Sequence, residues 1–202
     1  MAKIVGRVKP VLHEMMVKRG FKRVESAYYI KERINDPSFI NIIAFMYSSY
    51  PSVREISPVY GVGNIDVNRI FRQLTGRKNI WLHNQNCGYC QPMSSYKTWS
   101  LDEDVDEAGL SSVCMDIVRD IDKYSEDYFQ RMSSIEALID YYSSKPVGQM
   151  ICFYLPILYL VSGQKDMGID YLEKARKEWW FEKSSQLQEF YNNYRNYEFN
   201  RL

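Results

Sequence analysis

The sequence has no long hydrophobic run and no excess of charge of one sign. Its longest apolar stretch, Met150 to Val161, is shorter than the ~20 residues that a membrane-spanning helix needs. The 26 basic and 25 acidic residues leave a formal net charge of +1, so the chain lacks the overall positive field that favours nucleic acid. We therefore expect neither membrane nor nucleic-acid binding.

Histidine is nearly absent and cysteine is sparse. Because the chain has only His13 and His83, its spacing supports no Ser-His-Asp or Cys-His-Asn catalytic arrangement. The segment from Met1 to Pro10 interleaves charged and apolar residues, unlike the apolar core of a secretory signal. The four cysteines are therefore expected to be reduced thiols in the cytoplasm.

The charge that the chain does carry is unevenly distributed. Residues 1–33 contain nine Lys or Arg and three Glu, whereas residues 102–144 contain twelve Asp or Glu and three Lys or Arg. One interpretation is that the two regions face each other or simply solubilise two surfaces. The other is that the acidic region offers a face to a basic partner.

The first half of the chain mixes helical and strand patterns. Apolar residues with helical spacing over 5–16 predict a helix that Gly20 ends. Strand-forming residues over 27–34 and 39–47, separated by an Asn-Asp-Pro-Ser turn, predict an antiparallel hairpin. Further strands are expected at 56–62, 80–82 and 96–100.

Helical patterns dominate from residue 106 onward. Between the strands expected at 56–62 and 80–82 we expect one short helix, capped by Asp66. Ser133 and Glu136 fit a capping box at the start of a later helix. Residues 150–162 are apolar on nearly all sides, which indicates a buried central helix.

These patterns together predict an α+β fold. An N-terminal helix on a small antiparallel sheet would be followed by a helical C-terminal half. We expect two subdomains, a helix-plus-sheet subdomain at 1–105 and a helical subdomain at 106–202. The change from mixed to purely helical patterning places their boundary near residue 105.

One helical pair resembles a tetratricopeptide unit. The spacing Tyr159-x3-Gly163-x4-Gly168-x3-Leu172-x2-Ala175 is similar to that of the repeat, in which small residues let two antiparallel helices pack closely. Gly168 departs from the pattern, since alanine is usual there. Only one unit is evident, and a repeat architecture needs about three. The resemblance therefore implies a helical hairpin inside a globular domain.

A wider resemblance covers most of residues 1–145. An opening helix and Gly20-Phe21-Lys22-Arg23 lead into a Tyr-bearing hairpin, then Tyr60-Gly-Val-Gly63, a Trp/Cys segment and an acidic helical half with Tyr128-Phe129. This order of features resembles a bacterial domain family of unknown function. The resemblance implies the same α+β fold and carries over no activity or catalytic residue.

The segment Cys87-Gly-Tyr-Cys90 is the one place where chemistry is easy to imagine. A thiol–disulfide site would need a helix after Cys87 to lower the pKa of its thiol, but Pro92 follows and no convincing helix starts. For zinc, His83, Cys87 and Cys90 supply three ligands, and structural zinc needs a fourth. The third alternative is two cysteines packed as small hydrophobes in a loop between strands.

Two other segments resemble ligand-binding loops only superficially. Gly61-Val-Gly63 precedes a helix but lacks the third glycine and the lysine of a phosphate loop. The acidic run 102–107 lacks the central glycine and the closing glutamate of a calcium loop. We expect a strand-exit turn and a helix N-terminus at these places.

Aromatic residues gather in the last helices. Trp179, Trp180, Tyr191 and Tyr194 can pack in the core, or they can anchor a contact with another protein. Because no catalytic arrangement is found, a non-enzymatic protein that binds an unknown protein partner is favoured, and immunity to a toxin is one such role. No cofactor is expected in that case.

Two alternatives remain open. The protein can be a structural-zinc protein that uses His83, Cys87 and Cys90. It can also be a thiol–disulfide enzyme that uses Cys87 as its nucleophile. The arrangement of these side chains in space decides how well each alternative is supported.

Overall fold

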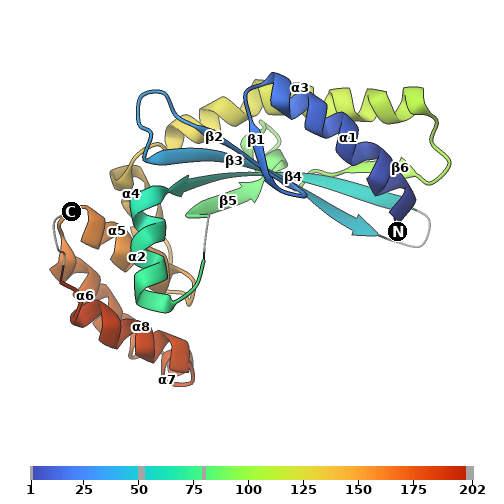
Figure 1. Cartoon of the computed structure of the whole chain (residues 1–202). Helices are drawn as coiled ribbons and strands as arrows, with labels where there is room; N and C mark the ends of the chain where they lie inside the picture. The colour runs from blue at the N-terminus through green and yellow to red at the C-terminus, as the bar shows by residue number, and fades with distance from the viewer. Residues whose placement is uncertain (1, 50–52, 79–80, 199–202) are drawn as a thin grey trace. The chain divides into compact units, whose positions relative to one another are not determined.

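The computed structural model describes residues 2–49, 53–78 and 81–198 (Figure 1). It has an α+β fold, which confirms the fold class predicted from the sequence. An N-terminal helix and a six-stranded antiparallel sheet are followed by a helical C-terminal half. None of the described helices is both long and apolar enough to cross a membrane.

The chain divides into two compact units that interleave along the sequence. Unit 1 comprises Met1–Gly63 and His83–Met132, and unit 2 comprises Asn64–Leu82 and Ser133–Leu202. This division does not follow the boundary predicted near residue 105. The long helix that begins just after that point belongs to the unit of the sheet, and a short helix from the first half belongs with the C-terminal helices.

Unit 1 is built on the sheet, whose strands follow the order β1-β2-β3-β4-β5, with β6 also paired to β4. β2 and β3 form the predicted hairpin. The strand expected at 27–34 is preceded by one that the pattern missed, since a tight turn at Ser26 and Ala27 separates β1 from β2. The strands are β1 Lys22–Glu25, β2 Tyr28–Glu32, β3 Phe39–Ser49, β4 Val53–Asn64, β5 His83–Asn86 and β6 Trp99–Asp102.

Two of the predicted strands are displaced along the chain. The strand expected at 80–82 is β5, which begins at His83, and Ile80 lies outside the described residues. The strand expected at 96–100 is β6, which begins at Trp99. The sequence of β5, His-Asn-Gln-Asn, has little intrinsic strand preference, so pairing with β4 decides its conformation.

Two helices lie along one face of the sheet, α1 Ala2–Lys18 and α3 Glu107–Arg131 (Figure 1). After α1 the chain turns at Gly20, which has a φ of 80°, as the sequence predicts. Tyr60 of β4 packs its ring against Tyr128 of α3, and both side chains are fully buried. These contacts fix α3 against the middle of the sheet.

The basic N-terminal region faces the acidic helix. Arg7 Nη2 lies 2.7 Å from Glu107 Oε1, and Arg19 Nη2 lies 2.6 Å from Asp122 Oδ2. These two ion pairs join the basic region to the part of the acidic region that lies in unit 1, as the first interpretation of the uneven charge expects. Part of the acidic charge of α3 is therefore already paired inside the chain.

Unit 2 consists of helices packed around α5. That helix is buried on nearly all sides, as its uniformly apolar sequence predicts, and Pro156 lies within it. Its neighbours include α2, α4, α6 and α8. The helices of the unit are α2 Ile65–Thr75, α4 Ile135–Ser143, α5 Ile151–Val161, α6 Lys165–Ala175, α7 Trp179–Glu182 and α8 Ser185–Arg195.

Two predicted helix caps are shifted by one or two residues. Asn64 caps α2, and its side chain accepts a hydrogen bond from the backbone N–H of Asp66, the residue predicted to be the cap. Ser134, not Ser133, caps α4 and accepts from the N–H of Ala137. At both places two nearby residues can cap a helix equally well, and the residue at which the helix begins decides which of them does so.

Helices α5 and α6 form the hairpin that the tetratricopeptide-like spacing implies. A Cβ atom placed on Gly168 would lie 2.0 Å from the hydroxyl oxygen of Tyr194 and 3.2 Å from the Cα atom of Pro156. Tyr194 cannot easily retreat, because it is fully buried and its hydroxyl donates to the Pro156 carbonyl at 2.8 Å. The close packing therefore leaves no room for a side chain at position 168.

We predict that Gly168→Ala lowers the free energy of unfolding by about 1–3 kcal/mol, the usual cost of an overpacked core. Gly148→Ala is the matched control, because its nearest neighbouring atom lies 3.9 Å from the added carbon. Urea unfolding followed by circular dichroism measures both variants. Equal stability of the two variants would contradict the packing described for Tyr194.

Candidate functional site

The candidate site is a twelve-residue loop, the 87–98 loop, that leaves the sheet between β5 and β6. Both strands pair with β4, since β5 ends opposite Val59 and β6 begins opposite Ile56. The two strands therefore follow one another along the same side of β4. Pro58, which has no backbone N–H to donate, lies in the gap between them.

The side chain of Asn86 closes the base of the 87–98 loop. Its Oδ1 accepts from the backbone N–H of Gly88 at 2.9 Å and of Lys97 at 2.8 Å, and its Nδ2 donates to the Lys97 carbonyl at 2.9 Å. Gly88 is required by close approach, because a Cβ atom there would lie 2.0 Å from the Ser95 carbonyl oxygen. One buried amide thus joins both ends of the loop.

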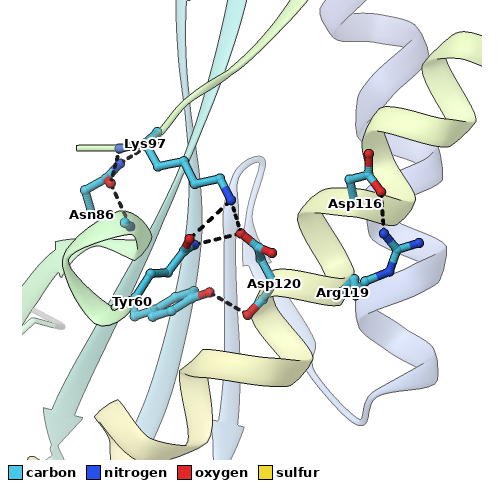
Figure 2. A network of polar contacts seen from close by, with 8 residues as sticks. Tyr60, Asn86, Lys97, Asp116, Arg119 and Asp120 are labelled. Atoms are coloured by element: carbon cyan, nitrogen blue, oxygen red, sulfur yellow. Dashed lines mark hydrogen bonds and ion pairs between the residues drawn. The ribbon is translucent and has the colours of Figure 1, made fainter. Parts of the chain in front are cut away.

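A second set of contacts joins the loop to α3 (Figure 2). Lys97 Nζ pairs with Asp120 Oδ2 and also donates to Gln91 Oε1 at 3.2 Å. Gln91 Nε2 donates to the same Asp120 oxygen at 2.7 Å. The Asp120 backbone is held separately, because its carbonyl accepts from the hydroxyl of Tyr60 at 3.3 Å.

Two turns shape the loop between these anchors. Cys87–Cys90 forms a 3₁₀ turn, and the N–H of Ser94 then donates to the Gln91 carbonyl at 2.9 Å, with Pro92 at the second position of the turn. Ser94 has a φ of 44° and is the one non-glycine residue with positive φ among the described residues. Such backbone strain persists where surrounding contacts enforce it, and it is concentrated at functional sites.

The loop presents large apolar side chains to solvent. Tyr89, Met93 and Tyr96 are 47%, 87% and 61% exposed. The Tyr96 hydroxyl lies 3.0 Å from the Ser57 hydroxyl of β4, so part of this side chain is oriented by the sheet. Residues 84–96 carry no formal charge. The loop is therefore firmly held, and its exposed apolar side chains lie in an uncharged stretch.

The residues proposed as zinc ligands are engaged in other contacts. His83 is buried in the core, where its Nδ1 lies 2.8 Å from the hydroxyl of Tyr128. Cys90 Sγ accepts a hydrogen bond from Gln85 Nε2 at 3.0 Å, and Cys87 is fully buried. In the described part of the chain, no three His, Cys, Asp or Glu side chains are grouped so that they could hold a metal ion.

The electrostatic surroundings do not favour thiol chemistry at Cys87. Burial, together with the negative charge of Asp120, raises the pKa of the Cys87 thiol to about 12. Burial also raises the pKa of Cys90. A thiol–disulfide enzyme needs a nucleophilic thiolate, and these shifts keep both sulfurs protonated at neutral pH. The segment is the loop between two strands that the third alternative expects.

The predicted aromatic contact residues divide between core and surface. Tyr194 is fully buried and Tyr191 is 5% exposed, so both belong to the core of unit 2 and are unavailable as surface anchors. Trp180 is half-buried, and only Trp179 is largely exposed, at 70%. Trp179 lines a shallow hollow whose other lining residues include Trp180, Gln149 and Lys183.

Comparison with known proteins gives no relative from which a role could be transferred. The chain matches no protein-family model, no curated protein and no solved structure. The resemblance to a bacterial domain family therefore stays a prediction.

The sequence located the loop but missed the residues that hold it. Asn86 and Gly88 carry a weak signal, since an asparagine before a tight turn is a common capping residue. Lys97 is the first charged residue after the uncharged segment 84–96. Asp120 has no signal of its own, because nothing in a run of helical acidic residues shows which one faces the loop.

We predict that Gly88→Ala destabilises unit 1 by about 1–3 kcal/mol. The added carbon would meet backbone atoms of Ser95 and Lys97, and the Asn86 side chain holds the Lys97 backbone in place. Gly6→Ala is the matched control, since Gly6 lies within α1 and no atom outside the backbone of that helix lies within 4 Å of the added carbon. That control should instead stabilise by about 0.5–1 kcal/mol. Thermal unfolding of both variants measures the difference, and a neutral Gly88→Ala would contradict the close packing of the loop.

Proposed function

We propose that the protein is a non-enzymatic, cytoplasmic protein that acts by binding another protein through the 87–98 loop. The observation that carries this proposal is the exposure of Met93 and of two tyrosines on a loop that the rest of unit 1 holds in place. Tyrosine and methionine are enriched at protein interfaces. Large apolar side chains at the tip of an anchored loop suit this use better than they suit contact with water.

The anchoring contacts support binding for an energetic reason. A loop that is already ordered loses little conformational entropy when it meets a partner, so more of the contact energy appears as affinity. Tyrosine also has few rotatable bonds for the area that it covers. Because residues 84–96 are uncharged, the partner is proposed to offer an apolar, uncharged recess in which Met93 is buried.

A second contact surface is proposed at Trp179, which is exposed beside the hollow that it shares with Trp180. It has less support, because Trp179 lies in a four-residue helix that has no side-chain cap. We propose no zinc or thiol role for His83, Cys87 and Cys90, since no contact of these residues favours one.

We predict that Met93→Asp abolishes partner binding without affecting the fold. An aspartate cannot be buried in an apolar recess without a large desolvation cost, so enrichment of the partner should fall at least about tenfold. The tagged variant and the wild type are expressed in the native cell, and co-purifying proteins are quantified by mass spectrometry.

Met150→Asp is the control for the added charge. Met150 is 60% exposed in unit 2, so it tests the same substitution at a comparable surface position outside the loop. The control should retain every partner that the wild type enriches. The proposal fails if no protein is enriched by the wild type, or if Met93→Asp and Met150→Asp retain the same partners.

A further inference from the structure

We infer that Asp120 is a positioning residue that holds the 87–98 loop in its binding conformation from outside the loop. The inference rests on the proposed function only in its claim that this conformation is the one that binds. Its structural part concerns α3 and the loop alone, which both belong to unit 1.

Two sets of contacts with different chemistry hold the loop. At its base, the neutral Asn86 side chain bonds only to backbone groups of Gly88 and Lys97. Further out, the contacts with α3 depend on one carboxylate, because Lys97 and Gln91 both donate to Asp120 Oδ2 (Figure 2). The base therefore keeps the ends of the loop together, while Asp120 fixes the part that leads to the tip.

Gln91 links this carboxylate to the backbone turn that carries Met93. The Gln91 side chain donates to Asp120 and accepts from Lys97, and the Gln91 carbonyl accepts from the N–H of Ser94 to close the turn. Met93 lies between these two residues of the turn. A change at Asp120 therefore reaches the most exposed apolar side chain of the loop through two hydrogen bonds.

Asp120 is well suited to this role because its own position does not depend on the loop. Its backbone carbonyl accepts from Tyr60, a fully buried residue of β4, and α3 packs on the sheet through Tyr128 and other side chains. The Asp120 side chain is 19% exposed, compared with 37% for Lys97. Among the described residues, no other carboxylate forms an ion pair with Lys97.

Loss of the carboxylate charge should therefore release Lys97 rather than displace α3. A partly buried ammonium without a counter-charge is better solvated outside the protein, and its departure removes one of the contacts of Gln91. Asp120→Asn keeps the size of the side chain and removes the charge. The expected result is a loop that becomes mobile beyond its base and whose contacts between Asn86 and Lys97 open more often.

Trypsin tests this inference directly, because it must take the Lys97 side chain into its own pocket before it can cut after that residue. In the wild-type protein Lys97 is held by Asp120 and should be cut slowly. In Asp120→Asn, cleavage between Lys97 and Thr98 should accelerate roughly ten- to a hundredfold, the factor expected for loss of a charge-assisted hydrogen bond. The fragments are identified by mass spectrometry, and the melting temperature is measured in parallel.

Asp116→Asn is the matched control. Asp116 also lies on α3 and pairs with an arginine, Arg119, but this pair is exposed and does not touch the loop (Figure 2). Cleavage at Lys97 should be unchanged in this variant. Unchanged cleavage in Asp120→Asn, or equal acceleration in both variants, would overturn the inference.

A second variant covers the case in which Asp120→Asn does not fold. Gln91→Ala removes the neutral partner of both Lys97 and Asp120 and should accelerate cleavage to a smaller extent. No acceleration in a folded Gln91→Ala would count against the inference in the same way. The proteolysis result is independent of any partner, so it can stand even if Met93→Asp shows that the loop binds nothing.

Discussion

Strand β4 is the constraint on which the rest of the structure depends. Along one side it pairs with β5 and then with β6, and the interruption between them creates the 87–98 loop. Tyr60 of this strand packs on α3, and its hydroxyl donates to the Asp120 carbonyl, which fixes where Asp120 lies beside the sheet. Its last residue, Asn64, caps α2. One strand therefore decides where the loop leaves the sheet and which helical residue the loop meets.

The loop illustrates how a segment without regular structure is held in one conformation. Its fixed points are a neutral amide at the base, a β-turn with Pro92 near the tip, and a carboxylate supplied by a helix. No single contact of this kind contributes much to the stability of the whole protein. Their combined effect is local, because each contact restricts the backbone at a different point of the same twelve-residue loop.

The global pattern of the fold could be predicted from sequence, and the details of the site could not. Hydrophobic periodicity identified α1, the hairpin of β2 and β3, and the buried helix α5, because long apolar patterns specify both element type and burial. It failed for β5, whose polar His-Asn-Gln-Asn sequence becomes a strand only by pairing with β4. For Tyr191 and Tyr194 the sequence left core packing and protein contact open, since aromatic content alone does not distinguish the two, and the structure places both in the core.

The division of the chain into two compact units could not be predicted from sequence patterns either. The change of pattern near residue 105 is real, but α3 packs with the sheet and α2 with the C-terminal helices, so the compact units interleave. Long-range contacts of this kind leave no local signal. The partners of Lys97 are a further example, because Asp120 is one of several acidic residues on α3 and only the fold selects it.

Amide hydrogen exchange of the free protein tests the central claim most directly, namely that the 87–98 loop is ordered before it meets any partner. The backbone N–H groups of Gly88, Gln91, Ser94 and Lys97 each donate within the loop or to Asn86. All four are expected to exchange at least roughly tenfold more slowly than in an unstructured chain. Exchange of these amides at the unstructured rate, while the amides of β4 stay protected, would contradict it.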